Sequence, residues 1–428
     1  MAESKSSRSP MPVEYNTHKK LDALVVQIDR LLLSDFPHED TRAALDLMRE
    51  YFIDQKARLT KSTALNDPKI ISQACITINE RIYSYLPLLG FLLRSTNVRN
   101  SFESYDAFVQ IAHGLIGDHA KVVMSSEWDF SPLTYPMNVS VLPNFVLLGM
   151  PTSESANALI LPLAGHELGH SVWVSEDFEA VYSTQLEDKA RDYLKKNWSD
   201  FKRAFPEHGH LQVTDEELSN NIFLAHLTAD IVDLASSQVE ETFCDAVGVA
   251  VFGKSYIHSF HYLLAPSLGG GRSPHYPPLR SRAAFMCDYG GIDLSSIGYG
   301  DYVKEFDDDG SISLPPRDAF LLRTADAISH ELAPYVYQEA KTFAVNKIPQ
   351  HLPTEEGERD VYKMYQSNIP ARAPRSLADI LNAGWAYVIN EGPNFDEKQR
   401  PLFNWISELM LKSIEVLEFR RRLADAGL

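Results

Sequence analysis

Cysteine is scarce in this sequence. The 428 residues include three cysteines, Cys75, Cys244 and Cys287, which lie far apart and form no C-x-x-C pair. A disulfide-stabilised secreted domain needs more cysteines at closer spacing. The cysteine content is typical of a protein from a reducing compartment, and we expect a cytoplasmic location.

Long hydrophobic runs are also missing. The longest apolar stretches, residues 85–93 and 139–150, are interrupted by Pro, Gly or Asn. They are shorter than the roughly 18 to 20 residues that a membrane span requires. Residues 1–16 are polar and Ser-rich and lack the apolar segment of a signal peptide, so they are interpreted as a disordered tail. We therefore expect a soluble protein with no membrane span.

Positive charge is in deficit. The chain has 40 Lys and Arg against 58 Asp and Glu, a formal net charge of -18. Such a balance argues against a nucleic-acid backbone or an anionic membrane surface as the main partner. We expect no nucleic-acid partner, and the excess of acidic residues does not identify a substrate.

The most informative stretch is HELGH at residues 166–170, an H-E-x-x-H pattern. On an α-helix, residues four apart lie one turn above each other, so His166 and His170 can present two imidazoles to one metal ion. Glu167 flanks the same pocket and can take a proton from a water at the metal. The pattern predicts a zinc site with Zn2+ as the cofactor.

A second segment, residues 239–246, offers the third ligand. It reads as E-x-x-x-D on a helix, so Glu241 and Asp245 share one face. Glu241 can complete a site of two histidines and one glutamate, while Asp245 accepts the second N–H of a ligating imidazole and fixes its tautomer. Glu240 points ~100° away on the helix and is the less favoured ligand.

A Gly- and Pro-rich loop at residues 269–282 contains further polar side chains. Tyr276, His275 and Arg282 could stabilise an oxyanion opposite the zinc. A purely structural turn is an equally good interpretation of this loop.

The rest of the chain divides into regions with different sequence patterns. Residues 17–130 and 313–428 show helical periodicity, and residues 131–300 contain the metal motifs. Within residues 138–149, two β-rich runs broken by Pro-Asn predict a hairpin, which could hold a peptide by backbone pairing or could be a plain part of the core. Pro162 implies that the motif helix either kinks there or begins near Leu161. The predicted fold is mainly α (α+β), with a small sheet or hairpin and helical flanks.

The order of these motifs resembles that of the gluzincin metallopeptidases, in particular the branch with the CAAX prenyl proteases and the heat-shock protease HtpX. Those proteins show N-A-F-x-x-P, H-E-x-x-H, E-x-x-A-D and a late H-P-x-x-x-x-R. This chain has N-V-S-V-L-P at 138–143, HELGH, E-x-x-x-D and a Pro-Pro segment ending at Arg282. The resemblance, over residues 138 to 282, implies a zincin-like core with His166, His170 and Glu241 as zinc ligands, Glu167 as general base and Asp245 as their support.

The chain also departs from that family. Cys244 stands where the family has Ala, and Tyr276 stands where it has His, with His275 one place early. The membrane helices of those relatives have no counterpart here. We therefore expect a zinc peptidase acting on a peptide or protein substrate. A non-catalytic regulator that binds a protein partner through its helical flanks, or a zinc hydrolase of a non-peptide amide, are the alternatives.

Overall fold

The structure is a computed structural model of the chain. It describes residues 13–95, 101–127, 141–154, 156–212, 214–265, 272–293, 302–306, 314–396, 398 and 400–427. Within these residues the protein is mainly helical, with one small sheet, which confirms the predicted class. Residues 1–12 of the expected tail lie outside the described residues, and the first helix begins at Val13. No described helix is both long enough and apolar enough to cross a membrane.

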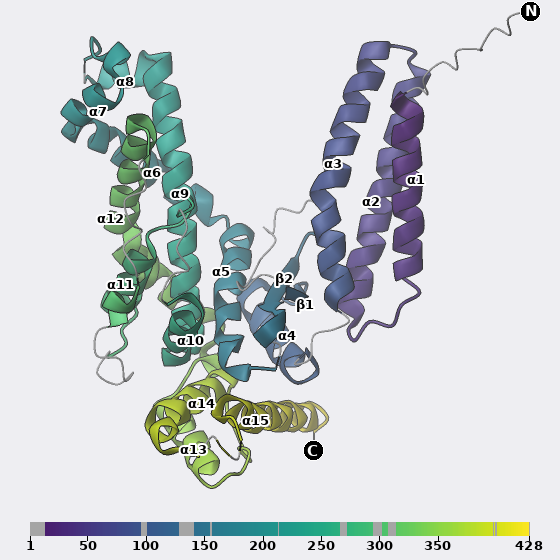
Figure 1. Ribbon diagram of the computed structural model, residues 1–428, viewed down its shortest axis with the longest axis vertical. Helices are drawn as coiled ribbons and strands as arrows, with labels where there is room; N and C mark the ends of the chain where they lie inside the picture. The colour runs from purple at the N-terminus through teal and green to yellow at the C-terminus, as the bar shows by residue number, and fades with distance from the viewer. Residues whose placement is uncertain are drawn as a thin grey trace, which may run out of the picture.

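Three N-terminal helices, α1 (Val13–Leu31), α2 (Glu39–Ala64) and α3 (Pro68–Arg94), stand side by side at the right of Figure 1. Asp67 caps α3 by accepting the N–H groups of Lys69 and Ile70, and Pro68 occupies the first turn, where no N–H is needed. Their apolar faces form a second hydrophobic cluster, together with one face of the sheet, and this cluster contains Phe52 and Ile82. Asp67 and Pro68 together therefore fix the start of α3.

The sheet consists of two parallel strands, β1 (Lys121–Glu127) and β2 (Phe145–Pro151), with Lys121 opposite Phe145. The prediction of a hairpin is therefore wrong for its second run. That run forms β2 and pairs in parallel with β1, which precedes the predicted hairpin. Residues 138–140 of the hairpin lie outside the described residues. The helical interpretation of 17–130 also fails at β1. All seven residues of β2 are buried, so this strand offers no open edge for a peptide.

The two strands separate two hydrophobic cores. Val146 and Leu148 of β2 belong to the large cluster, while Phe145 and Leu147 belong to the N-terminal one. A strand that is buried on both faces reads as a continuous apolar run and shows no alternation of polar and apolar residues. This accounts for the missing period-two pattern in the sequence.

The large core is built around α9 (Ile222–Phe252), which packs on α5 (Ala164–Ser175), α6 (Phe178–Lys196) and α12 (Pro316–Lys347) (Figure 1). One cluster of buried residues runs from Ala107 to Ile414, so the metal-motif region and the C-terminal helices share a core. The remaining helices are α4 (Ser101–Ile116), α7 (Trp198–Ala204), α8 (Asp215–Asn220), α10 (Lys254–Leu264), α11 (Leu279–Tyr289), α13 (Glu355–Gln366), α14 (Leu377–Glu391) and α15 (Leu402–Asp425).

The motif helix begins after its proline. A short 3-10 segment, Ala158–Leu163, contains Pro162 and is capped by the side chain of Asn157. The helix α5 then starts at Ala164, so the proline ring does not interrupt it. Of the two predicted alternatives, the later start is confirmed.

Candidate metal centre

The motif helix α5 and the helix α9 cross at very short range. A Cβ atom at Gly169 would lie 2.6 Å from the Cα of Cys244, and one at Gly165 would lie 2.8 Å from the Cα of Gly248. Only residues without a side chain allow the two backbones to approach this closely. The glycine inside HELGH therefore brings the two histidines within reach of α9.

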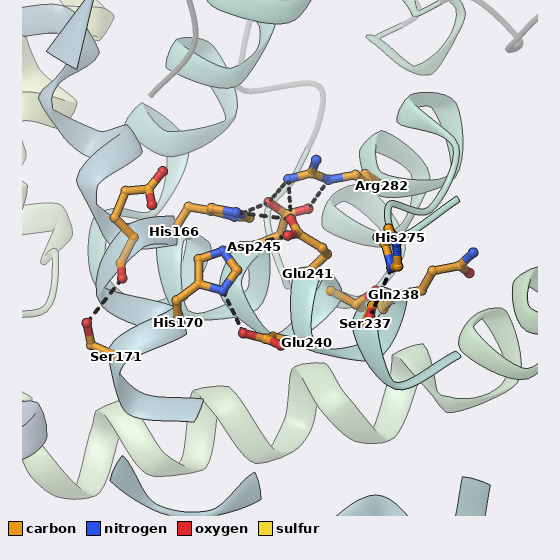
Figure 2. A network of polar contacts seen from close by, with 12 residues as sticks. His166, His170, Ser171, Ser237, Gln238, Glu240, Glu241, Asp245, His275 and Arg282 are labelled. Atoms are coloured by element: carbon orange, nitrogen blue, oxygen red, sulfur yellow. Dashed lines mark hydrogen bonds and ion pairs between the residues drawn. The ribbon is translucent and has the colours of Figure 1, made fainter. Parts of the chain in front are cut away.

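Both imidazoles approach Glu241 with their Nε2 atoms. His166 Nε2 lies 3.2 Å from Glu241 Oε2, and His170 Nε2 lies 3.6 Å from Glu241 Oε1 (Figure 2). Zinc binds such nitrogen and oxygen donors at about 2.0–2.2 Å in a tetrahedral arrangement, so its ligands lie about 3–4 Å from one another. The structure thus brings together the three residues that the sequence predicts as ligands.

The other nitrogen of each imidazole contacts a carboxylate. His166 Nδ1 lies 3.0 Å from Asp245 Oδ1, and His170 Nδ1 lies 2.8 Å from Glu240 Oε1. A histidine that donates Nδ1–H in this way has its Nε2 lone pair free for a metal. The expected partner role of Asp245 is seen for His166.

Glu240 is the residue that the sequence reasoning missed. Its side chain is 31% exposed and reaches His170 from the edge of α9, although the helical-wheel argument placed it outside the site. The wheel describes α9 alone, whereas α5 runs antiparallel to α9, so that His166 lies at Asp245 and His170, one turn later, lies at Glu240. The sequence contains one signal for Glu240. Asp245 can accept the N–H of only one imidazole, so the second histidine needs another carboxylate as its acceptor.

Arg282 and Tyr256 hold Asp245. The guanidinium donates Nε–H to Asp245 Oδ2 at 2.7 Å and Nη2–H to Oδ1 at 2.8 Å, and the Tyr256 hydroxyl donates to Oδ1 at 2.7 Å. Burial alone would raise the pKa of Asp245, but Arg282 and His166 hold that pKa well below its usual range. Arg282 was expected near an oxyanion; here it is buried and paired with Asp245.

The carboxylates control the charge of His166. Burial by itself lowers the pKa of this imidazole, but the hydrogen bond to Asp245 and the negative charge of the nearby Glu241 outweigh burial and raise the pKa to about 10. Glu241, in turn, has its pKa lowered, because the contact with His166 outweighs its own burial. The site therefore stabilises a positive charge between these carboxylates.

Two buried carboxylate oxygens at this site have no hydrogen-bond partner among the described residues. Glu167 is 3% exposed, and its Oε2 makes no hydrogen bond. Glu241 Oε2 also makes none, because its 3.2 Å contact with His166 lacks hydrogen-bond geometry. Buried oxygens of this kind usually have a water or an ion as partner. Both fit a centre in which a metal and a water complete the contacts.

Cys244 is a competing donor. Within the described residues, the one group of three His, Cys, Asp or Glu donors lying within 4.8 Å of one another is His166, His170 and Cys244. Burial, reinforced by the charge of Glu241, raises the pKa of the Cys244 thiol well above its ordinary value. A metal prefers the thiolate, whereas the lowered pKa of Glu241 keeps its carboxylate ionised. The structure therefore favours Glu241 as the third ligand.

The two candidate residues of the loop diverge. His275 is exposed, and its Nδ1 lies 3.3 Å from Ser237 Oγ, away from the paired imidazoles (Figure 2). The ring of Tyr276 lies 5.6 Å from the Arg282 guanidinium. The charge of Glu241, together with burial and Glu167, raises the pKa of Tyr276 to about 12. The hydroxyl of Tyr276 is therefore protonated at neutral pH.

No protein-family model, curated protein or solved structure matches this chain. The assignment of the site therefore depends on its own chemistry.

Proposed function

We propose that this protein is a zinc-dependent peptidase with a zincin-like core, acting on a peptide or protein substrate. One observation supports the proposal most strongly: both Nε2 atoms converge on Glu241 while Asp245 and Glu240 engage the two Nδ1 atoms. His166, His170 and Glu241 would hold the zinc ion. The orphaned oxygens of Glu167 and Glu241 fit the same interpretation.

A bound zinc ion supplies a Lewis acid that polarises a carbonyl group and makes water more acidic. The protein residues perform the remaining steps. Glu167 takes the proton from the attacking water and delivers it to the leaving amine. Tyr276 donates a hydrogen bond to the oxygen that becomes negatively charged. Asp245 and Glu240 keep the imidazoles in the orientation and tautomer that zinc requires.

The degree of exposure fits this division of labour. The side chains of His166 and His170 are mostly buried, Glu167 is almost completely buried, and Tyr276 is open to solvent at the edge. A buried carboxylate can contact a single bound water molecule without competition from bulk solvent, while an open edge leaves space for a substrate chain.

A panel of peptide substrates, assayed with and without a chelator, tests the proposal. We expect hydrolysis that the chelator abolishes and added zinc restores. The double variant His166→Ala/His170→Ala serves as the control and should neither bind zinc nor cleave. Zinc bound by the wild-type protein without cleavage of any peptide would reject the peptidase proposal.

A further inference from the structure

The loop that carries Tyr276 is fastened to two helices. Gln238 of α9 donates its amide N–H groups to the carbonyl of Pro274 at 3.0 Å and to Asp326 Oδ1 at 2.9 Å. Arg272 donates from Nη2 to the same Asp326 oxygen at 2.5 Å. One carboxylate oxygen of α12 therefore receives a donor from α9 and a donor from the start of the loop.

This anchor is built into the protein interior. Gln238 is fully buried, and the side chain of Arg272 is 8% exposed. A buried amide and a buried guanidinium need acceptors, and a charge-assisted bond to a carboxylate is the strongest kind available. Asp326 supplies that acceptor to both donors, so removing this single carboxylate releases Arg272 of the loop directly and deprives Gln238, which holds Pro274, of its side-chain acceptor.

Two successive residues of the loop contact two successive residues of α9. Pro274 bonds to Gln238, and His275 contacts Ser237. The next loop residue, Tyr276, lies beside the metal site, because its ring is 5.6 Å from the Arg282 guanidinium, whose Nη2 is 3.8 Å from Glu241 Oε2. The phenol is 42% exposed, so its position depends on the backbone that carries it.

We infer that Asp326 is a positioning residue of the site, which fixes Tyr276 over the metal centre through Gln238 and Arg272. The inference rests on the proposed function, because Tyr276 is assigned there to the oxyanion. Asp326 lies on α12, outside every sequence motif, and touches none of the candidate ligands in the described contacts. Its effect on turnover is transmitted by the loop.

Hydrogen exchange of the segment 272–278 tests the anchor without any need for activity. In Asp326→Ala we expect the amide of Tyr276, which donates to the Ser273 carbonyl at 3.1 Å, to exchange about tenfold faster or more, because the loop opens locally, while zinc content stays at the wild-type level. Glu339→Ala, which removes an exposed carboxylate of the same helix, is the matched control and should leave exchange unchanged. Wild-type exchange in Asp326→Ala would overturn the inference.

A double-mutant cycle tests the route to turnover. Tyr276→Phe should lower kcat by about 10² to 10³, as expected for the loss of an oxyanion donor. Asp326→Ala should lower kcat less, and the double variant should be no slower than Tyr276→Phe alone. A double variant whose loss of kcat equals the product of the two single losses would overturn the inference. If the wild-type protein cleaves no peptide, the proposed function fails, whereas the exchange measurement still decides whether Asp326 holds the loop.

Discussion

The close crossing of α5 and α9 can be tested by one added methyl group, in Gly169→Ala. The new Cβ would lie 2.6 Å from the Cα of Cys244, whereas ordinary contact begins at 3.4 Å. The obstacle is backbone, which cannot rotate away as a flexible side chain can, so the helices must separate. Overpacking typically costs about 1–3 kcal/mol, and alanine regains up to ~1 kcal/mol of helix propensity. We expect a net loss of about 1–2 kcal/mol in unfolding free energy.

The same displacement should weaken the metal site, because His166 and His170 move away from Glu241. Denaturant unfolding and competitive zinc titration measure the two effects. Gly90→Ala is a matched control in the interior of α3, where the new Cβ would meet only the flexible end of Arg94. It should be neutral or stabilising and leave zinc affinity unchanged. A Gly169→Ala protein with wild-type stability and zinc affinity would refute the account of the helix crossing.

Three further predictions concern two contacts of the metal centre and one buried histidine. Glu240→Gln should lower zinc affinity or activity by about 10- to 100-fold, because His170 loses the anion at Nδ1; unchanged values would show that this contact is incidental. Glu241→Gln should lower zinc content in metal analysis far more than Cys244→Ala, and the opposite ranking would make the thiol the ligand. Burial lowers the pKa of His258 from 6.5 to about 3, so the folded state excludes a proton that the unfolded chain binds. The contribution of His258 is complete above pH 6.5 and is lost as pH falls towards 3. Between pH 7 and pH 5, the free energy of unfolding should therefore fall by about 2 kcal/mol less in His258→Gln than in the wild type. Parallel pH profiles would contradict this.

Local patterns in the sequence predict most of the helices and the central ligand set. Asp67-Pro68 specifies the start of α3, and the pairs His166/His170 and Glu241/Asp245 lie on single helices, where spacing alone determines which side chains share a face. These features depend on residues a few positions apart, so no knowledge of the tertiary structure is needed.

The features that the sequence does not predict depend on contacts between distant segments. The strands β1 and β2 pair in parallel, and β2 is buried on both faces. Neither a turn motif nor an alternation of polar and apolar residues therefore indicates this pairing in the sequence. Glu240 reaches His170 only because α5 packs antiparallel along α9. Arg282 pairs with Asp245 from a third helix, and this partnership cannot be distinguished from an oxyanion role by sequence spacing.

The most direct test of the central proposal compares the wild-type protein with Glu167→Gln in zinc content and peptide turnover. The account predicts that the variant retains one zinc per chain, because its three ligands are untouched. Its turnover should fall by about 10² to 10⁴ or more, because the amide cannot accept the proton of the attacking water. Wild-type turnover by Glu167→Gln would contradict the assignment of Glu167 as the general base, and with it the proposed mechanism.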